Sequence, residues 1–192
     1  MRIVGLLLAA GSAKRFGSDK LLHPLQHGVP IAVQAARHLK KEIPHVVAAL
    51  RPGSDRLAGL LRAEGCEVAI CENANEGMGA SLACAVRATG PADGYLVALA
   101  DMPFVRPSSI AAIRDALAQG AAIAAPYFRT RRGHPVGIAG RFFDQLIESA
   151  GDEGARKLLA AHEADLVKVP IGDPGVIRDI DQPGDLVPPI VV

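Results

Sequence analysis

The sequence has few aromatic residues: Phe, Tyr and Trp together make up 4% of its 192 residues, and Trp is missing. Proteins that bind single-stranded nucleic acid without sequence preference stack the bases on aromatic side chains, so this composition argues against that class. An excess of one charge is also missing, because 21 Lys and Arg balance 20 Asp and Glu to a net charge of +1. Anion binding therefore has to come from a local cluster, and we expect no nucleic-acid partner.

Cysteine and long apolar runs are scarce as well. Cys66, Cys71 and Cys84 form no CxxC pair, have no histidines at zinc-ligand spacing, and are odd in number, which favours reduced core thiols in a cytoplasmic protein. The apolar start, "IVGLLLAA", is too short to span a bilayer and at the short end for a secretory signal. Its strand-forming residues favour a buried first strand, and we expect no membrane partner.

The 49% of hydrophobic residues suffice for a full core, and we expect residues 1–192 to form a single domain. Near-continuous apolar runs are typical of strands buried on both faces of a parallel sheet. They are residues 2–9, 45–51, 66–72, 95–100 and 122–128. Apolar residues three and four apart predict helices between them. These are residues 31–41, 54–64, 79–88 and 107–118. The alternation predicts an α/β fold with a doubly wound, mostly parallel sheet that binds ligands at the carboxyl ends of its strands.

The pattern changes after Phe128. "RTRRGHPVGIAG" predicts a basic turn and a short strand, which we expect to form a small β subregion that faces the substrate. Helices are predicted near residues 141–148 and 153–162, and strands near residues 166–171 and 176–180.

The first predicted strand leads into "AAGSAKRFGSDK", a loop that carries Lys14, Arg15 and Lys20. Its glycines permit a close approach of the backbone to a ligand, and its cations suit a polyphosphate. It is not a Walker loop, because five residues instead of four separate its glycines and Ser18 stands at the Lys position. The spacing predicts an anion-binding loop, with a solvated cationic loop as the alternative.

Carboxylates follow two of the predicted strands. Asp101 comes after the fourth strand, where its side chain can hold a hard cation against phosphate oxygens. Asp179 and Asp181 are two residues apart, so in an extended segment they face the same way, and one of them can complete a magnesium site with Asp101. A helix cap at Asp101 and an Asx turn before Pro183 are the alternatives.

"LAAGSAKRFGSDKLL", residues 8–22, resembles the nucleotide-binding signature of the nucleotidyltransferases that activate sugars, polyols and molybdopterin. Five further segments occur in the order found in the molybdenum cofactor cytidylyltransferase branch of that family. They are "ENANEGMGASLACAV", "ALADMPFV", "RRGHPVGI", "GDEGARKLL" and "DIDQPGDL". The resemblance spans residues 3–186, and six ordered segments are far more specific than any one of them.

This resemblance implies transfer of CMP from CTP to the terminal phosphate of molybdenum-bound molybdopterin. The products are the molybdopterin cytosine dinucleotide cofactor and pyrophosphate, and a molybdenum hydroxylase is the expected client. The acceptor phosphate is already ionised, so positioning and charge neutralisation suffice without a nucleophile triad. Three alternatives stay open: guanylyl transfer to the same pterin, cytidylyl transfer to methylerythritol phosphate, and a non-catalytic chaperone that delivers the cofactor.

The resemblance also implies roles for single residues. Lys20 stabilises charge on the α-phosphate, Lys14 and Arg15 hold the β and γ oxygens, and Asp101 holds Mg²⁺ with Asp181 as the expected second ligand. The pterin is expected at Arg132, Gly133 and His134. The other nucleotide-binding residues are Leu8, Ala9, Ala10, Gly11, Asn73, Gly79 and Ser81. Guanylyltransferases of the family tend to carry Gly at the position of Ala10, so its methyl group favours cytosine.

Overall fold

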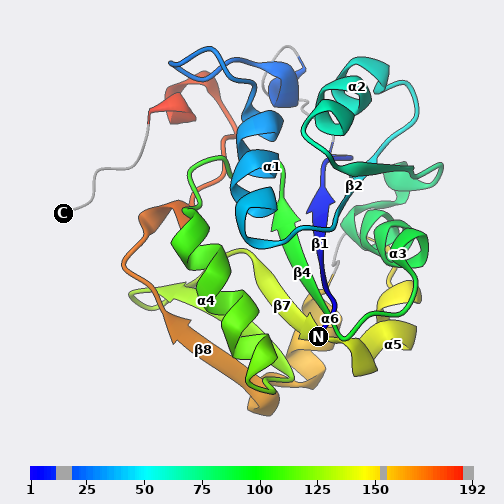
Figure 1. The fold of residues 1–192 in the computed structure, drawn as a ribbon, viewed down its shortest axis with the longest axis vertical. Coiled ribbons are helices and arrows are strands. Elements are labelled where there is room, and N and C mark those ends of the chain that lie inside the picture. Colours follow the sequence, from blue (N-terminus) through cyan, green and yellow to red (C-terminus); the bar gives the residue numbers. More distant parts are fainter. Residues whose placement is uncertain (12–18, 152–154, 188–192) are drawn as a thin grey trace.

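A computed structural model describes residues 1–11, 19–151 and 155–187 of the chain. Among these residues, an eight-stranded sheet has the order β3-β2-β1-β4-β7-β5-β6, and β8 pairs with β5 (Figure 1). The strands are β1 (Ile3–Leu8), β2 (Val46–Leu50), β3 (Glu67–Ile70), β4 (Gly94–Leu99), β5 (Ile123–Phe128), β6 (Arg131–Arg132), β7 (Val136–Ala139) and β8 (Leu166–Pro170).

The sheet is mostly parallel, as predicted. β1 pairs in parallel with β2 and β4, and β8 pairs in parallel with β5. The predicted β subregion consists of β6, which pairs antiparallel with the end of β5, and β7, which is part of the central sheet. β7 lies antiparallel between β4 and β5. It packs closely on α4, because a Cβ on Gly137 would come within 2.9 Å of Ile113 and Leu117.

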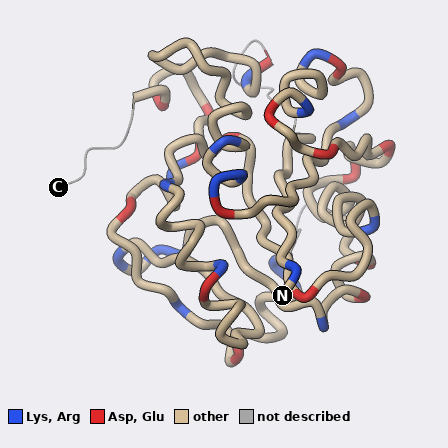
Figure 2. The backbone as a smooth tube through the Cα atoms, viewed as in Figure 1, with Lys and Arg blue, Asp and Glu red and all other residues tan. Residues whose placement is uncertain are grey.

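Helices cover both faces of the sheet, which confirms the α/β fold class. α1 (Ile31–Glu42), α2 (Asp55–Ala63) and α4 (Pro107–Ala118) pack on one face, where α1 and α4 lie side by side (Figure 1). α3 (Met78–Thr89), α5 (Phe143–Ile147) and α6 (Arg156–Ala161) pack on the other. Within the described residues, no helix is long and apolar enough to cross a membrane. Basic and acidic residues are interspersed along the chain (Figure 2).

The strand predicted near residues 176–180 was wrong. Pro174–Ile177 form a 3-10 helix, which the buried carboxylate of Asp173 ties to the start of α4. Asp173 accepts hydrogen bonds from the backbone N–H of Arg106 at 2.9 Å and from the Ser109 hydroxyl at 2.8 Å. Val176 and Ile180 are fully buried, so the segment has the apolar character of a strand without the conformation.

The expectation of reduced thiols was also wrong for two of the three cysteines. Cys71, directly after β3, forms a disulfide with Cys84 on α3, with the two Cα atoms 5.8 Å apart. Cys66 is free and buried, and its burial raises the pKa of the thiol. The pair is brought together by packing of α3 against the sheet, which no local spacing in the sequence reveals.

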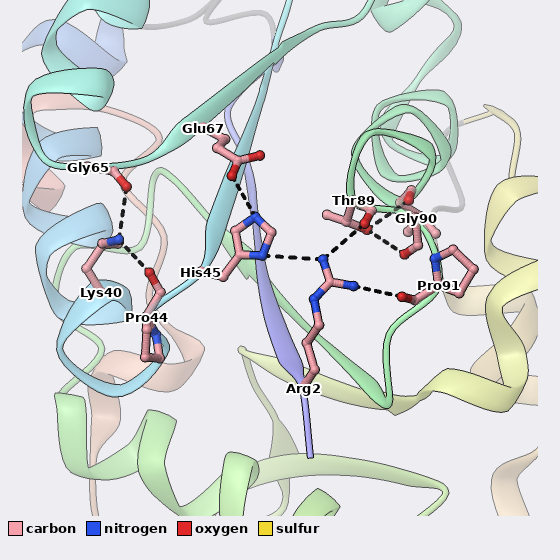
Figure 3. Close-up of polar contacts among 10 residues, drawn as sticks. Arg2, Lys40, Pro44, His45, Gly65, Glu67, Thr89, Gly90 and Pro91 are labelled. Carbon is pink, nitrogen blue, oxygen red and sulfur yellow. Dashed lines mark hydrogen bonds and ion pairs between the residues drawn. The ribbon is translucent and has the colours of Figure 1, made fainter.

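Polar groups at the edge where β1 begins are paired within the chain (Figure 3). The Arg2 guanidinium donates to the carbonyl oxygens of Pro91 at 2.7 Å and of Thr89 at 3.2 Å. The imidazole of His45 lies 3.0 Å from the Glu67 carboxylate. These contacts lie at the amino edge of the sheet, opposite the edge formed by the carboxyl ends of the parallel strands.

Candidate nucleotide-binding site

A cavity of about 670 Å³ lies at the carboxyl ends of β1, β2 and β3. Its volume is within the range of small-molecule and cofactor sites. Its wall combines the end of β1, the segments that follow β2 and β3, the start of α3, and the acidic residues beyond β4. The lining residues are Leu8, Ala9, Ala10, Gly11, Lys20, Leu21, Arg51, Pro52, Glu72, Ala74, Asn75, Gly77, Met78, Ser81, Leu99, Asp101 and Asp181.

Most of the predicted nucleotide-binding residues lie together in this wall. Leu8, Ala9, Ala10, Gly11 and Ser81 line the cavity with Lys20. Their roles in nucleotide binding stay predictions, and their shared position in the cavity wall supports them.

Two predicted nucleotide-binding residues are not among the lining residues of the described chain. Gly79 packs against the backbone beyond α5, since a Cβ there would lie 2.5 Å from the carbonyl oxygen of Ala150. The Asn73 amide contacts Glu76 at 3.5 Å. Lys14 and Arg15 lie outside the described residues.

The sequence patterns did not predict several other residues that line the cavity. Arg51 directly follows β2, and Glu72 comes two residues after β3. Ligands of open α/β sheets bind at the carboxyl ends of the strands, so this rule alone points to both positions. Asn75 lies between β3 and α3, and Met78 is the first residue of α3; in this part of the chain the sequence predicted Asn73 and Gly79 instead.

Lys20 joins two of the acidic residues at the rim of the cavity. Its ammonium lies 2.9 Å from Asp101 Oδ2 and 3.3 Å from Asp181 Oδ1, and its side chain is only 12% exposed. Burial by itself lowers the pKa of Lys20, but the charge and hydrogen bond of Asp101, together with those of Asp181, outweigh it and raise the pKa above its ordinary value. Lys20 is therefore a fixed positive charge at this rim.

The three predicted acidic residues meet at this point. Asp101, Asp179 and Asp181 each offer a carboxylate oxygen, and these atoms all lie within 4.8 Å of one another. The Ile180 N–H donates to the Asp101 carbonyl oxygen at 2.9 Å, which fixes the segment of Asp179 and Asp181 against the end of β4. Carboxylate oxygens are the ligands that hard divalent cations prefer, so this set fits Mg²⁺ or Mn²⁺.

The predicted pterin-binding residues are on the far side of β4 from the cavity. Arg132 is exposed on β6. Gly133 packs on the backbone, because a Cβ there would lie 2.1 Å from the carbonyl oxygen of Val176. His134 is half-buried and its Nδ1 is fully enclosed, without a hydrogen-bond partner among the described residues. Burial, assisted by the positive charges of Arg132 and Arg156, lowers the pKa of His134 to about 4. The imidazole is therefore a neutral group at neutral pH.

Comparison with known proteins identifies the family. Residues 5–166 match the family described as the MobA-like NTP transferase domain. The chain belongs to this family. Nucleotidyl transfer is the activity of MobA-like domains, and the protein is accordingly a nucleotidyltransferase by family.

Among curated relatives, the MobA-like chain is 26% identical over 191 residues to the purine catabolism protein PucB of Bacillus subtilis (strain 168), covering 94% of this chain and 92% of PucB. Among solved structures, it is similar to Rv0371c of Mycobacterium tuberculosis H37Rv, with a TM-score of 0.82, 25% identity, and coverage of 96% of this chain and 94% of that one.

Two more distant structures share the fold. A nucleotidyl transferase from Methanothermobacter has a TM-score of 0.81 at 20% identity, over 96% of this chain and 94% of that one. The molybdopterin-guanine dinucleotide biosynthesis protein A of Archaeoglobus fulgidus has a TM-score of 0.65 at 21% identity, over 95% of this chain and 94% of that one.

Proposed function

We propose that this MobA-like protein transfers CMP from CTP to the terminal phosphate of molybdenum-bound molybdopterin, with Mg²⁺ as the metal. One observation carries the proposal. A nucleotide-sized cavity ends at a rim where Lys20 and the carboxylates of Asp101, Asp179 and Asp181 come together. This is the charge arrangement that phosphoryl-type transfer needs, in a chain of a nucleotidyltransferase family.

The reaction replaces one bond to the α-phosphorus by another. The terminal phosphate oxygen of the acceptor forms the new bond, and the bond from the α-phosphorus to the bridging oxygen of pyrophosphate breaks. The acceptor oxygen is already ionised, so no general base is required. Asp101 with Asp181 or Asp179 would hold Mg²⁺, which would neutralise part of the phosphate charge. Lys20 donates from its ammonium to an α-phosphate oxygen, whose negative charge grows during the transfer.

Arg132 and Lys168 form an exposed cationic patch on the other side of β4, and this patch favours an anionic acceptor there. Arg132 is the cross-strand partner of Tyr127, so both side chains lie on the same face of the sheet. The ammonium of Lys168 on β8 lies 5.6 Å from the centre of the Tyr127 ring. An aromatic ring between two cations suits a flat, phosphorylated heterocycle such as a pterin.

The choice of CTP rests on Ala10. Ala10 is a lining residue of the cavity and is 7% exposed, and we infer that its methyl group takes space that a larger base would use. A methyl group in a pocket discriminates by about 10- to 200-fold.

The decisive experiment incubates the protein with each of the four NTPs, Mg²⁺ and molybdenum cofactor, and measures pyrophosphate and the dinucleotide product. We expect turnover with CTP. Preference for GTP would assign guanylyl transfer instead. Turnover with CTP only when methylerythritol phosphate replaces the pterin would change the acceptor. Binding of cofactor without pyrophosphate from any NTP would assign the delivery chaperone.

A further inference from the structure

The disulfide between Cys71 and Cys84 closes a loop that forms one wall of the nucleotide cavity. Cys71 lies directly after β3, and Cys84 lies midway along α3. The residues between them include Glu72, Ala74, Asn75, Gly77, Met78 and Ser81, all of which line the cavity. The covalent ring thus contains the wall that connects the sheet to the start of α3.

The two ends of this ring are fixed in different ways. The Cys71 N–H donates to the Leu50 carbonyl oxygen at 2.8 Å, and the residue is 1% exposed, so this end is part of the sheet. The other end belongs to α3, whose first turn rests on Ala150 through the close approach at Gly79. The disulfide is a second covalent link between these two supports, in addition to the polypeptide chain itself.

The middle of the ring is stabilised by short-range contacts. The Ala74 N–H donates to the Cys71 carbonyl oxygen at 3.1 Å, and the Glu76 N–H donates to the Asn73 carbonyl oxygen at 3.0 Å. Gly77 then turns into α3 with a φ of 121°, a conformation that suits glycine. Such short-range contacts define a turn, but they do not set the distance between this turn and the middle of α3, where Cys84 lies. The disulfide restricts that distance.

We propose that Cys71 and Cys84 are positioning residues of the nucleotide site, whose disulfide holds this wall in the shape that binds nucleotide, and that reduction by a dithiol weakens nucleotide binding. The inference rests on the proposed use of the cavity for a nucleotide. Cys84 is half-buried, whereas Cys71 is 1% exposed, so Cys84 is the end of the disulfide at which a reductant would attack. A dithiol thiolate attacks Cys84 Sγ, and Cys71 leaves as a thiolate and takes up a proton. The second thiol of the reductant then releases Cys84, so that two electrons pass to the protein and the reductant becomes a disulfide.

The test is calorimetric titration of the full chain with CTP and Mg²⁺, without acceptor, before and after treatment with dithiothreitol. We expect the dissociation constant for CTP to rise about tenfold on reduction, because the released wall must be ordered when the nucleotide binds. Reoxidation should restore the original dissociation constant. The double variant Cys71→Ala/Cys84→Ala should bind CTP with the dissociation constant of the reduced protein, and dithiothreitol should not change that constant. Cys66→Ala is the matched control. It should bind CTP as the parent protein does, and its dissociation constant should still rise on treatment with dithiothreitol.

Steady-state kinetics separate positioning from a general loss of structure. Reduction should raise KM for CTP and leave KM for the acceptor unchanged, whereas partial unfolding would raise both and would contradict the proposal. Equal CTP affinity of the oxidised and reduced proteins would refute it even if CMP transfer proceeds. Redox-dependent binding without CMP transfer would support it and refute the proposed function instead.

Discussion

Replacement of Asp101 by asparagine tests the acidic cluster most directly. The amide keeps the shape of the side chain but removes the negative charge that contacts Lys20 at 2.9 Å and belongs to the group of three carboxylates. We expect kcat to fall about 100-fold or more, as for other groups that stabilise charge in a transition state, which corresponds to about 2.7 kcal/mol. The side chain of Asp101 is 26% exposed, and ion pairs of this kind contribute about 1 kcal/mol or less to folding. Activity should therefore fall far more than stability.

The measurement is pyrophosphate release at saturating CTP and acceptor over a series of Mg²⁺ concentrations, with thermal melting of the same samples. Asp101→Asn should need more Mg²⁺ for half-maximal activity and melt within a few degrees of the parent protein. Asp115→Asn is the matched control, because Asp115 is an exposed residue of α4 that pairs with Arg114. A folded Asp101→Asn protein with the rate and Mg²⁺ requirement of the control would refute the role given to Asp101.

Three further predictions concern single side chains. Lys20→Ala should lower kcat more than it raises KM for CTP, and Arg15→Ala should mainly raise KM; steady-state kinetics with the reverse pattern would mean that the two roles are exchanged. Ala10→Gly should lower the ratio of kcat/KM for CTP over GTP by about 10-fold or more, and an unchanged ratio would refute only the role of its methyl group. The pKa of His134 is about 4 in the folded protein and 6.5 as its ordinary value, so the unfolded chain takes up the proton first as the pH falls. The fold should lose about 3 kcal/mol between pH 6.5 and pH 4 from this residue, and His134→Gln should remove that part of the loss in urea titrations at several pH values.

The sequence patterns located most of the fold because burial on both faces leaves a local signal. The apolar runs at residues 2–9 and 122–128 predicted β1 and β5 to within a residue or two at each end. The position of β7 between β4 and β5 has no such signal, since it depends on pairing between segments far apart in the chain. Apolar character also misled the prediction near Val176, whose burial comes from a 3-10 helix tied to α4 by Asp173.

The candidate site shows the same division. Asp101 and Lys20 were identifiable because each stands in a recognisable local context, one after a buried strand and the other in a cationic loop. Their contact at 2.9 Å, and the presence of Asp179 beside Asp181 in the cluster, depend on how the last part of the chain returns to the end of β4. The disulfide between Cys71 and Cys84 is a tertiary contact of the same kind, and so the count of cysteines predicted the wrong redox state.

The order of the strands places the proposed acceptor site on the opposite side of β4 from the nucleotide cavity. Displacement at phosphorus requires the attacking and leaving oxygens to lie roughly in line on opposite sides of the α-phosphorus. The cavity lies over β1, β2 and β3, whereas Arg132 and Lys168 belong to β6 and β8 on the other side of β4. If the nucleotide and the acceptor bind on these two sides as proposed, they would meet at the end of β4, where Asp101 and Lys20 are in contact. In the sheet, β4, β7 and β5 lie between β1 and β6, so the two proposed binding regions lie on opposite sides of β4. An acceptor bound at Arg132 and Lys168 would therefore approach the α-phosphorus from the side of β4 that is opposite to the nucleotide cavity.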